Sequence, residues 1–202
     1  MKYIGFLKKQ TEYLNSTQED VEKRFVLLGE SWSDGVYLKT QEALCEVATT
    51  KKVLYEALCR AALSATDYYN AYIEIQGLGS EHLIRKHPFP SYKNTLRRDG
   101  SYMQNKFSST NVTDLVAMES FMRALDLYIK STADIMTKLG REHSQIVASR
   151  SWVAPQCQQL GEVIKSIDTK MKAQLERLYV LNKYIKSKYN GILEQQQKKI
   201  QY

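Results

Sequence analysis

The chain has 202 residues, of which 43% are hydrophobic and 25% charged, a balance typical of soluble globular proteins. This length suffices to bury an apolar core, which excludes disorder of the whole chain. Glycine (9) and proline (3) are scarce, so the composition favours long helices over a turn-rich sandwich or barrel. No stretch approaches the roughly 18 consecutive apolar residues of a membrane span, and the first residues lack the apolar region of a secretory signal. We therefore expect a cytoplasmic protein at synthesis; if it is exported, the route is a specialised, signal-peptide-independent secretion system.

Apolar or small residues recur at alternating steps of three and four over most of the chain, which indicates helices. The first such ladder spans residues 7–28 and ends at Gly29, a suitable C-terminal stop. The second spans residues 44–75, with Lys51 as its only charged member. Continued from Val36, it predicts a helix of about 40 residues, well beyond the usual length. The short turn between the two helices makes them antiparallel neighbours.

Residues 77–110 interrupt the helical pattern with three glycines and two of the three prolines, which places a boundary there. A third helix is expected to begin at residues 111–114, with Thr113 as its cap, and to end near Ser149. A second short turn then leads into a fourth helix, in which Pro155 suits the first position. The sequence thus predicts an all-α fold of two long antiparallel helical hairpins.

This pattern gives three predicted segments. The first hairpin occupies residues 1–76, a basic linker with glycine and proline occupies 77–113, and the second hairpin occupies 114–202. The hairpins either pack together as an elongated four-helix bundle with coiled-coil seams or stand in tandem, and the sequence leaves both arrangements open. Because Tyr13-Leu-Asn-Ser-Thr resembles Tyr128-Ile-Lys-Ser-Thr and a Ser-Trp step occurs in each turn, we interpret the halves as copies of one design.

Both tryptophans of the chain, Trp32 and Trp152, fall in the turns between long helices. An indole at such a bend can cover the ends of both helices while its N–H bonds to an open backbone carbonyl. A buried structural plug is therefore favoured over an exposed partner anchor, although tryptophan is enriched at interface hot spots. The hairpin-turn motif consists of Ser31, Trp32, Gly35, Ser151, Trp152 and Pro155.

A helical hairpin with Ser-Trp in its connecting turn resembles the WXG family, the small ESAT-type proteins of type VII secretion systems. Members are roughly half as long as this chain, so the resemblance covers it twice, at residues 3–75 and 114–195. The family's tryptophan corresponds to Trp32 and Trp152, whereas its glycine two positions later is absent here. The resemblance implies a secretion partner, adaptor or chaperone for a bacterial effector or secretion machine.

Fourteen tyrosines are many for this length, and several lie near the far ends of the two longest predicted helices. Core packing is the ordinary role of such residues. The alternative is a contact surface, because tyrosine presents a large area at little entropic cost. The candidate partner-binding residues are Tyr68, Tyr69, Tyr72, Tyr179, Tyr184 and Tyr189.

The formal net charge of +7 is concentrated in two places. Residues 77–110 contain six basic and two acidic residues, and residues 170–202 contain eight and two. The candidate basic residues of the linker are Arg85, Lys86, Lys93, Arg97 and Arg98. Basic residues interleaved with aromatics can bind nucleic acid or an anionic surface. No nucleic-acid-binding motif accompanies them, so we favour a solvated or partner-docked linker.

The sequence gives little support for an enzymatic function, because it lacks the motifs of phosphate-binding loops, zinc proteases and serine hydrolases. The three histidines are not spaced as metal ligands on one helix face. We therefore expect no enzyme, no catalytic or metal-binding residues and no cofactor. The favoured function is non-enzymatic binding of a protein partner through helix packing. The alternatives are a self-associating structural subunit of a phage or secretion assembly, and a nucleic-acid or anionic-surface binder.

Overall fold

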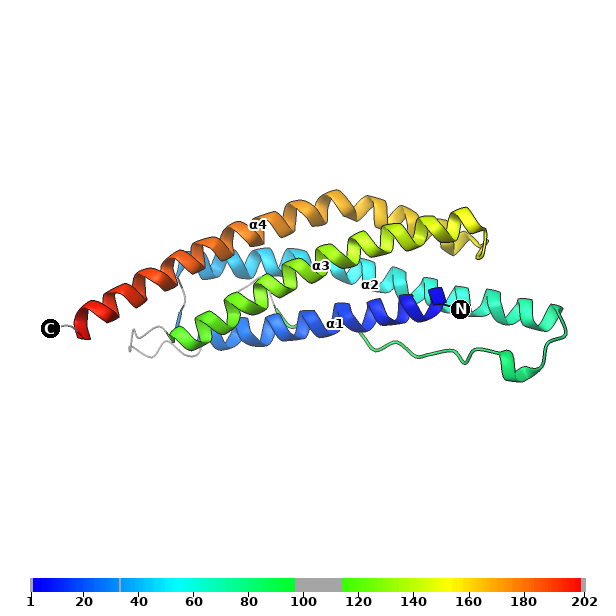
Figure 1. Cartoon of the computed structure of the whole chain (residues 1–202), viewed down its shortest axis with the longest axis horizontal. Helices are drawn as coiled ribbons and strands as arrows, with labels where there is room; N and C mark the ends of the chain where they lie inside the picture. Colours follow the sequence, from blue (N-terminus) through cyan, green and yellow to red (C-terminus); the bar gives the residue numbers. More distant parts are fainter. Residues whose placement is uncertain (1, 33, 97–113, 201–202) are drawn as a thin grey trace. The chain divides into compact units, whose positions relative to one another are not determined.

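The computed structural model describes residues 2–32, 34–96 and 114–200. Within these residues the chain forms four long helices and one short 3-10 helix, with no strand (Figure 1). The elements are α1 (Lys2–Gly29), α2 (Gly35–Ile75), η1 (Ser80–His82), α3 (Leu115–Ser149) and α4 (Pro155–Ile200). The prediction of an all-α fold is confirmed.

An aspartate placed directly before the helix determines where α2 and α3 begin. Asp34 Oδ1 accepts hydrogen bonds from the amides of Val36 and Tyr37 at 2.9 and 3.1 Å. Asp114 Oδ1 accepts two such bonds at the start of α3, at the same distances. These bonds satisfy amide groups that have no partner in a first helical turn. The predicted cap Thr113 lies outside the described residues, and Asp114 occupies the capping position.

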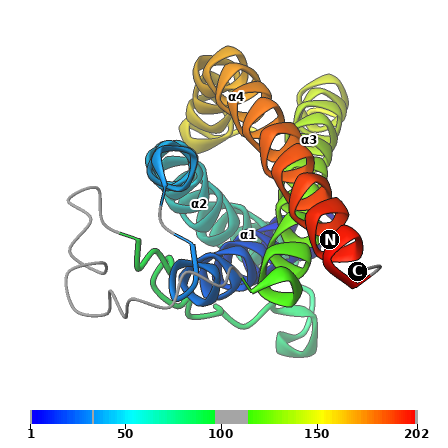
Figure 2. The same ribbon diagram turned by 90° about the vertical axis from the view of Figure 1, so that its left-hand side faces the viewer.

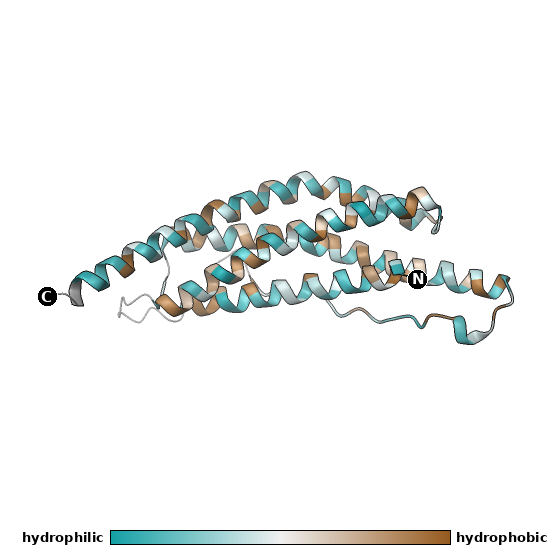
Figure 3. Ribbon diagram, in the orientation of Figure 1, coloured by the Kyte–Doolittle hydropathy of each residue, from teal (hydrophilic) through white to brown (hydrophobic). Residues whose placement is uncertain are grey.

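The predicted apolar ladders form the interior of the fold. Hydrophobic and hydrophilic residues alternate in bands along each helix (Figure 3). Side chains with no exposed surface include Leu7, Leu14, Leu44, Leu54, Leu58, Met118, Leu125, Leu178 and Ile185. Burial of apolar surface, at about 25 cal/mol per Å², is the main contribution that holds such helices together. Among the described helices, none combines the length and the apolar character needed to cross a membrane.

The chain divides into two compact units, and each unit takes one segment of every long helix. Unit 1 consists of Met1–Ser16, Thr50–Tyr92 and Asp134–Lys170. Unit 2 consists of Thr17–Thr49, Lys93–Ala133 and Met171–Tyr202. The units therefore do not coincide with the predicted segments 1–76, 77–113 and 114–202, because each unit combines parts of both hairpins and of the linker.

In unit 2, the C-terminal part of α1 packs against the N-terminal part of α3 (Figure 2). The rings of Phe25 and Phe121 lie 5.3 Å apart between centroids. The buried Tyr128 hydroxyl donates a hydrogen bond to Gln18 Oε1 at 2.7 Å. Because Gln18 is a member of the first ladder and Tyr128 comes from the second hairpin, the two hairpins contact each other within this unit.

The α1–α2 turn of unit 2 is closed by Trp32, which is 5% exposed. The rings of Trp32 and Tyr37 meet edge to face, with 5.9 Å between their centroids. Lys188 Nζ of α4 lies 5.0 Å from the centroid of the Trp32 ring. Lys188 also donates a hydrogen bond to the Asp34 carboxylate. The expected bond from the indole N–H to a carbonyl is not formed with any described residue. The N–H nevertheless lies near enough to Asp34 to help lower the pKa of that carboxyl.

The charge of Asp34 makes the stability of unit 2 depend on pH. Burial alone would raise the pKa of Asp34, but the bonds from Lys188 and from the amides of Tyr37 and Val36 outweigh it and lower this pKa. A carboxyl with a lowered folded-state pKa stabilises the fold above its unfolded pKa. This contribution is lost as the pH falls through the folded pKa.

The change Asp34→Asn keeps the helix cap but removes the charge. Near neutral pH we expect it to lower the free energy of unfolding by about 0.5–1 kcal/mol, the usual range for a partly exposed pair and a helix-end charge. The difference from the wild type should shrink as the pH falls below about 4 and through the folded pKa. Urea unfolding of both proteins from neutral to strongly acidic pH measures it. A difference that does not change with pH would contradict this role of Asp34.

Candidate functional site

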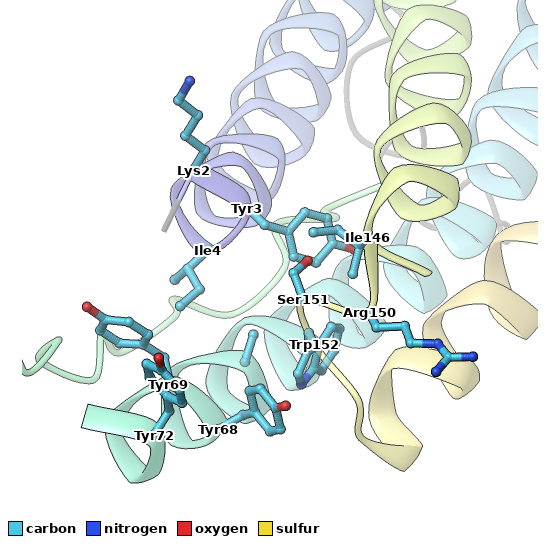
Figure 4. Close-up of a pocket in the computed structure, with 11 residues that line it drawn as sticks. Lys2, Tyr3, Ile4, Tyr68, Tyr69, Tyr72, Ile146, Arg150, Ser151 and Trp152 are labelled. Atoms are coloured by element: carbon cyan, nitrogen blue, oxygen red, sulfur yellow. The ribbon is translucent and has the colours of Figure 1, made fainter. Parts of the chain in front are cut away.

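A pocket of about 670 Å³ lies in unit 1, where the start of α1, the C-terminal part of α2 and the α3–α4 turn come together (Figure 4). Five of its eleven lining residues are aromatic. They are Tyr3, Tyr68, Tyr69, Tyr72 and Trp152, and the aliphatic side chains of Ile4, Ala65 and Ile146 complete the apolar lining. This volume falls within the range of sites that accept a small ligand or a cluster of partner side chains.

The pocket combines a buried indole with tyrosines that water reaches. Trp152 is 4% exposed, whereas Tyr68 and Tyr72 are 40% and 52% exposed. The Tyr3 ring packs against Trp152 with 6.0 Å between centroids. In Figure 4 Ile4 points toward the tyrosines of α2, so α1 and α2 both contribute apolar surface to the same hollow.

Two buried polar atoms of the pocket have no hydrogen-bond partner among the described residues. They are the indole nitrogen Nε1 of Trp152 and the hydroxyl of Tyr3. The expected bond from the Trp152 N–H to a backbone carbonyl is therefore not formed with the described part of the chain. Each such group costs about 1–3 kcal/mol, and few occur in a native fold. Burial, with smaller contributions from Cys157 and Glu142, also raises the pKa of Tyr3.

The charged residues of the lining are Lys2 and Arg150, both exposed and both positive. Neither forms an ion pair with a described residue. Arg150 directly follows α3 and has a φ of 50°, in the left-handed region that glycine usually occupies at a helix end. Its amide donates a hydrogen bond to Val147 O at 3.3 Å. An arginine thus occupies a backbone conformation that costs energy for any residue with a Cβ.

A second hollow of about 670 Å³ shares Arg150 and Trp152 with the first and extends between α3 and α4. His143 Nε2 lies 2.8 Å from the backbone oxygen of Cys157, so the ring proton resides on Nε2 and is donated there. A Cβ on Gly161 would lie 2.5 Å from His143 Cε1, which explains a glycine at this point of α4. Burial raises the pKa of the Cys157 thiol.

The predicted partner-binding tyrosines belong to two different units. Tyr68, Tyr69 and Tyr72 line the pocket of unit 1. Tyr179, Tyr184 and Tyr189 lie on the part of α4 that belongs to unit 2, and the ammonium of Lys183 lies 4.5 Å from the centroid of the Tyr179 ring. The two sets therefore do not form one described site.

The residues of the predicted hairpin-turn motif occupy the two turns or the helix ends beside them. Ser31 Oγ donates to Leu28 O at 3.3 Å at the end of α1. Gly35 and Pro155 are the first residues of α2 and α4. Ser151 and Trp152 lie in the α3–α4 turn and line the pocket.

Two of the predicted basic linker residues are paired with carboxylates of the helices. Lys86 contacts Asp67 at 2.8 Å in unit 1, and Lys93 contacts Glu19 at 2.7 Å in unit 2. Arg85 is exposed and has no ion pair with a described residue. The predicted residues Arg97 and Arg98 lie outside the described residues. Pairing lowers the positive charge that Lys86 and Lys93 would offer to a polyanion.

The described part of the linker docks on the helices through its backbone. The Asn70 side chain donates to Ile84 O at 2.9 Å and accepts from Ile84 N at 2.8 Å. Tyr55 donates to Pro90 O, and burial is the main reason that its pKa rises to about 12. These residues of the linker are thus docked on the chain's own α2, an arrangement that the sequence did not predict.

Several residues of the pocket were not predicted from the sequence, among them Tyr3 and Arg150. Tyr3 lies four positions before Leu7, so extending the first ladder by one step would have placed it on the buried face. The sequence Ser149-Arg150-Ser151 contains no glycine or asparagine where a helix ends. That absence was the signal of an unusual backbone conformation.

Comparison with known proteins adds no family to this description. No protein-family model, no curated protein and no solved structure matches the chain. The resemblance to the WXG family stays a prediction from the two hairpin turns.

Proposed function

We propose that this chain is a non-enzymatic helical binding protein that receives a segment of another polypeptide in the aromatic pocket of unit 1. The observation that carries the proposal is the half-exposed pair Tyr68 and Tyr72 beside the buried Trp152. Aromatic side chains around an apolar hollow provide the contact area that protein interfaces concentrate at their centres. Tyrosine does so at a low cost in side-chain entropy.

The ionisable groups near the pocket favour binding over catalysis. The pKa values of Tyr3 and Cys157 are both raised, so the hydroxyl and the thiol stay protonated near neutral pH. A general base or a thiolate nucleophile requires the opposite shift. His143 Nε2 donates to the backbone oxygen of Cys157 at 2.8 Å and lies 3.9 Å from the thiol of the same residue, so this ring nitrogen carries a proton and is not a base that could take the thiol proton. These groups suit the walls of a recognition site.

The partner class follows from the hairpin architecture. A hairpin with Ser-Trp in its turn supports the role of a WXG-like secretion partner, adaptor or chaperone for a bacterial effector or secretion machine. In this role the chain would cover an apolar segment that the partner cannot bury alone. Export of the chain itself by a specialised secretion system belongs to the same proposal.

Site-specific photo-crosslinking in the native cell tests the proposal. A benzophenone amino acid at Tyr72 should form a covalent adduct with a discrete polypeptide. The matched control is Leu63, which is 36% exposed on the same helix and does not line the pocket. At Leu63 the same label should give little adduct.

Four outcomes of this experiment are informative. An adduct from Tyr72 alone supports the proposal. Adducts of equal yield from both positions, or none from Tyr72, contradict it. An adduct with a second copy of the chain would instead support the structural-subunit alternative, which light scattering of the purified protein then checks.

A further inference from the structure

The pocket of unit 1 contains a buried hydrogen-bond donor that the described part of the chain does not use. Trp152 is 4% exposed, and its indole N–H has no acceptor among the described residues. In Figure 4 the nitrogen-bearing edge of this indole faces Tyr68 of α2, which is 40% exposed. Because exposed side chains change rotamer readily, a turn of the Tyr68 side chain gives an incoming acceptor access to the N–H. A bound group with such an acceptor would remove the cost of the unpaired donor.

The surroundings of this donor favour an uncharged acceptor. Lys2 and Arg150 are the charged residues of the lining, and in Figure 4 their ammonium and guanidinium groups point away from the hollow. A carboxylate beside Trp152 would therefore be desolvated without a counter-ion, which is strongly unfavourable. A carbonyl oxygen meets the same N–H without this penalty.

The conformation of the bound segment follows from the need for a free carbonyl. A carbonyl inside an α-helix already accepts a bond from its own chain, whereas a polyproline II segment has no internal hydrogen bonds. Proline-rich segments of this kind dock in grooves lined by aromatic side chains. Tyr3, Tyr69 and Tyr72 provide such a lining here. The donor and the tyrosines together fit an extended proline-containing segment better than a helix.

Unit 1 already binds an extended segment in this way on another part of its helices. Residues 84–91 of the linker contain no helix and include two prolines. Helix side chains donate hydrogen bonds to carbonyls of this segment at three places, from Asn70 to Ile84 at 2.9 Å, from Asn15 to Ser91 at 3.4 Å and from Tyr55 to Pro90.

The spacing of these contacts requires an extended chain. Asn70 and Tyr55 are about 22 Å apart along α2, and a polyproline II chain covers about 19 Å from Ile84 to Pro90. The bond from a helix side chain to a main-chain carbonyl is the contact that the Trp152 N–H lacks.

On the basis of the function proposed above, we propose that the pocket receives an extended, proline-containing segment of the protein partner. The Trp152 N–H donates a hydrogen bond to a main-chain carbonyl of this segment. Proline rings of the segment pack on Tyr69 and Tyr72. The indole thus recognises the main chain, and the tyrosines recognise the side chains.

Replacing Trp152 with benzothienylalanine separates its structural role from recognition. This amino acid has the shape of tryptophan but carries sulfur in place of the indole N–H. Because the N–H has no described acceptor in the free protein, the replacement should leave the unfolding temperature unchanged or raise it. It should weaken binding of a proline-containing segment by about three- to tenfold, the loss of one hydrogen bond. The matched control is the same replacement of Trp32, which does not line the pocket and should leave the affinity unchanged.

The probes are two short uncharged peptides, acetylated and amidated at their ends. One contains pairs of prolines separated by leucine and glutamine, and the other has alanine in place of each proline. Fluorescence anisotropy of the labelled peptides gives their affinities for the protein. Because polyproline II is preformed, we expect the proline peptide to bind about tenfold more tightly.

The indole signals of the two tryptophans show where the proline peptide binds. In protein made with isotope-labelled tryptophan, the Trp152 signal is the one that disappears in Trp152→Phe. This signal should shift downfield when the proline peptide binds, as its N–H gains an acceptor, and the Trp32 signal should not move.

Four results would overturn the inference. They are equal binding of both peptides, unchanged affinity after the replacement of Trp152, binding without a shift of the Trp152 signal, and tighter binding of a leucine-rich helical peptide of the same length. A lower unfolding temperature of the benzothienylalanine protein would also contradict it, because the N–H would then have a partner in the free protein.

The failure of this inference can be told apart from the failure of the proposed function. If Tyr72 crosslinks to a polypeptide while the proline peptide does not bind, the pocket receives a partner of other chemistry and only the proline assignment is overturned. If Tyr72 gives no adduct and the proline peptide does not bind, both proposals are contradicted.

Discussion

Replacing Trp32 with alanine is expected to lower the free energy of unfolding by about 3–5 kcal/mol, the usual loss for a buried aromatic side chain. The indole is 5% exposed, contacts Tyr37 edge-on and lies under the ammonium of Lys188. Alanine removes these contacts and leaves a cavity at the point where α1 turns into α2. Urea unfolding of the full-length protein, followed by far-ultraviolet circular dichroism, measures the loss.

The control for this prediction is a residue of similar apolar character on the exposed side of α1. Leu27 is 57% exposed, so Leu27→Ala should change the free energy of unfolding by less than about 0.5 kcal/mol. If Trp32→Ala cost no more than Leu27→Ala, the indole would not be what closes this turn.

Replacing Glu22 with alanine is the second change with a large expected effect, about 2–4 kcal/mol. Glu22 is 3% exposed, and its carboxylate accepts a bond from Gln18 Nε2 at 2.6 Å. It also accepts bonds from the amide and the hydroxyl of Thr95 at 2.9 and 2.6 Å. Alanine would leave these donors without this acceptor and would free the linker from α1. Urea unfolding measures the stability, and limited proteolysis near Thr95 measures release of the linker.

Glu19 provides the matched control, because it contacts the same stretch of linker from the exposed face of α1. Its bond from Lys93 at 2.7 Å is solvated, so Glu19→Ala should leave the unfolding midpoint and the proteolysis pattern nearly unchanged. Equal effects of the two substitutions would show that the buried carboxylate has no special part in docking the linker.

The two turns share the Ser-Trp step but have different surroundings. In unit 2, Lys188 covers the ring of Trp32 and bonds to Asp34. In unit 1, Trp152 lies beside a pocket that is open to solvent. If the halves arose as copies of one hairpin, the two turns have since diverged. Lys188 covers the first turn, whereas the second turn borders a pocket in which Tyr68 and Tyr72 are exposed.

Hydrophobic periodicity predicts the helices of this chain well, because it records which face of each helix is buried. The predicted stop at Gly29, the end near Ser149 and the start at Pro155 all agree with the helix ends. Periodicity does not say which helix covers which face. Hence the division into two units, each with segments of both hairpins, was not predicted.

The candidate site was only partly predictable, because it depends on contacts between residues distant in sequence. Tyrosine content pointed to Tyr68 and Tyr72, but nothing local indicated that Trp152 would lie beside them. Glu22 has the sequence environment of a solvated helix residue, and only the docked Thr95 makes it a buried acceptor. Such pairings depend on the path of the linker, which has no periodic pattern of its own.

Hydrogen–deuterium exchange of the protein, with and without the polypeptide captured at Tyr72, shows directly whether the pocket of unit 1 is the binding surface. The account predicts slower exchange in the segments that form the pocket, at residues 2–4, 65–72 and 150–152. It predicts little change in the α1–α2 turn of unit 2. Protection confined to α4 around residues 179–189, or to the linker around residues 85–96, would place the binding surface elsewhere and contradict it.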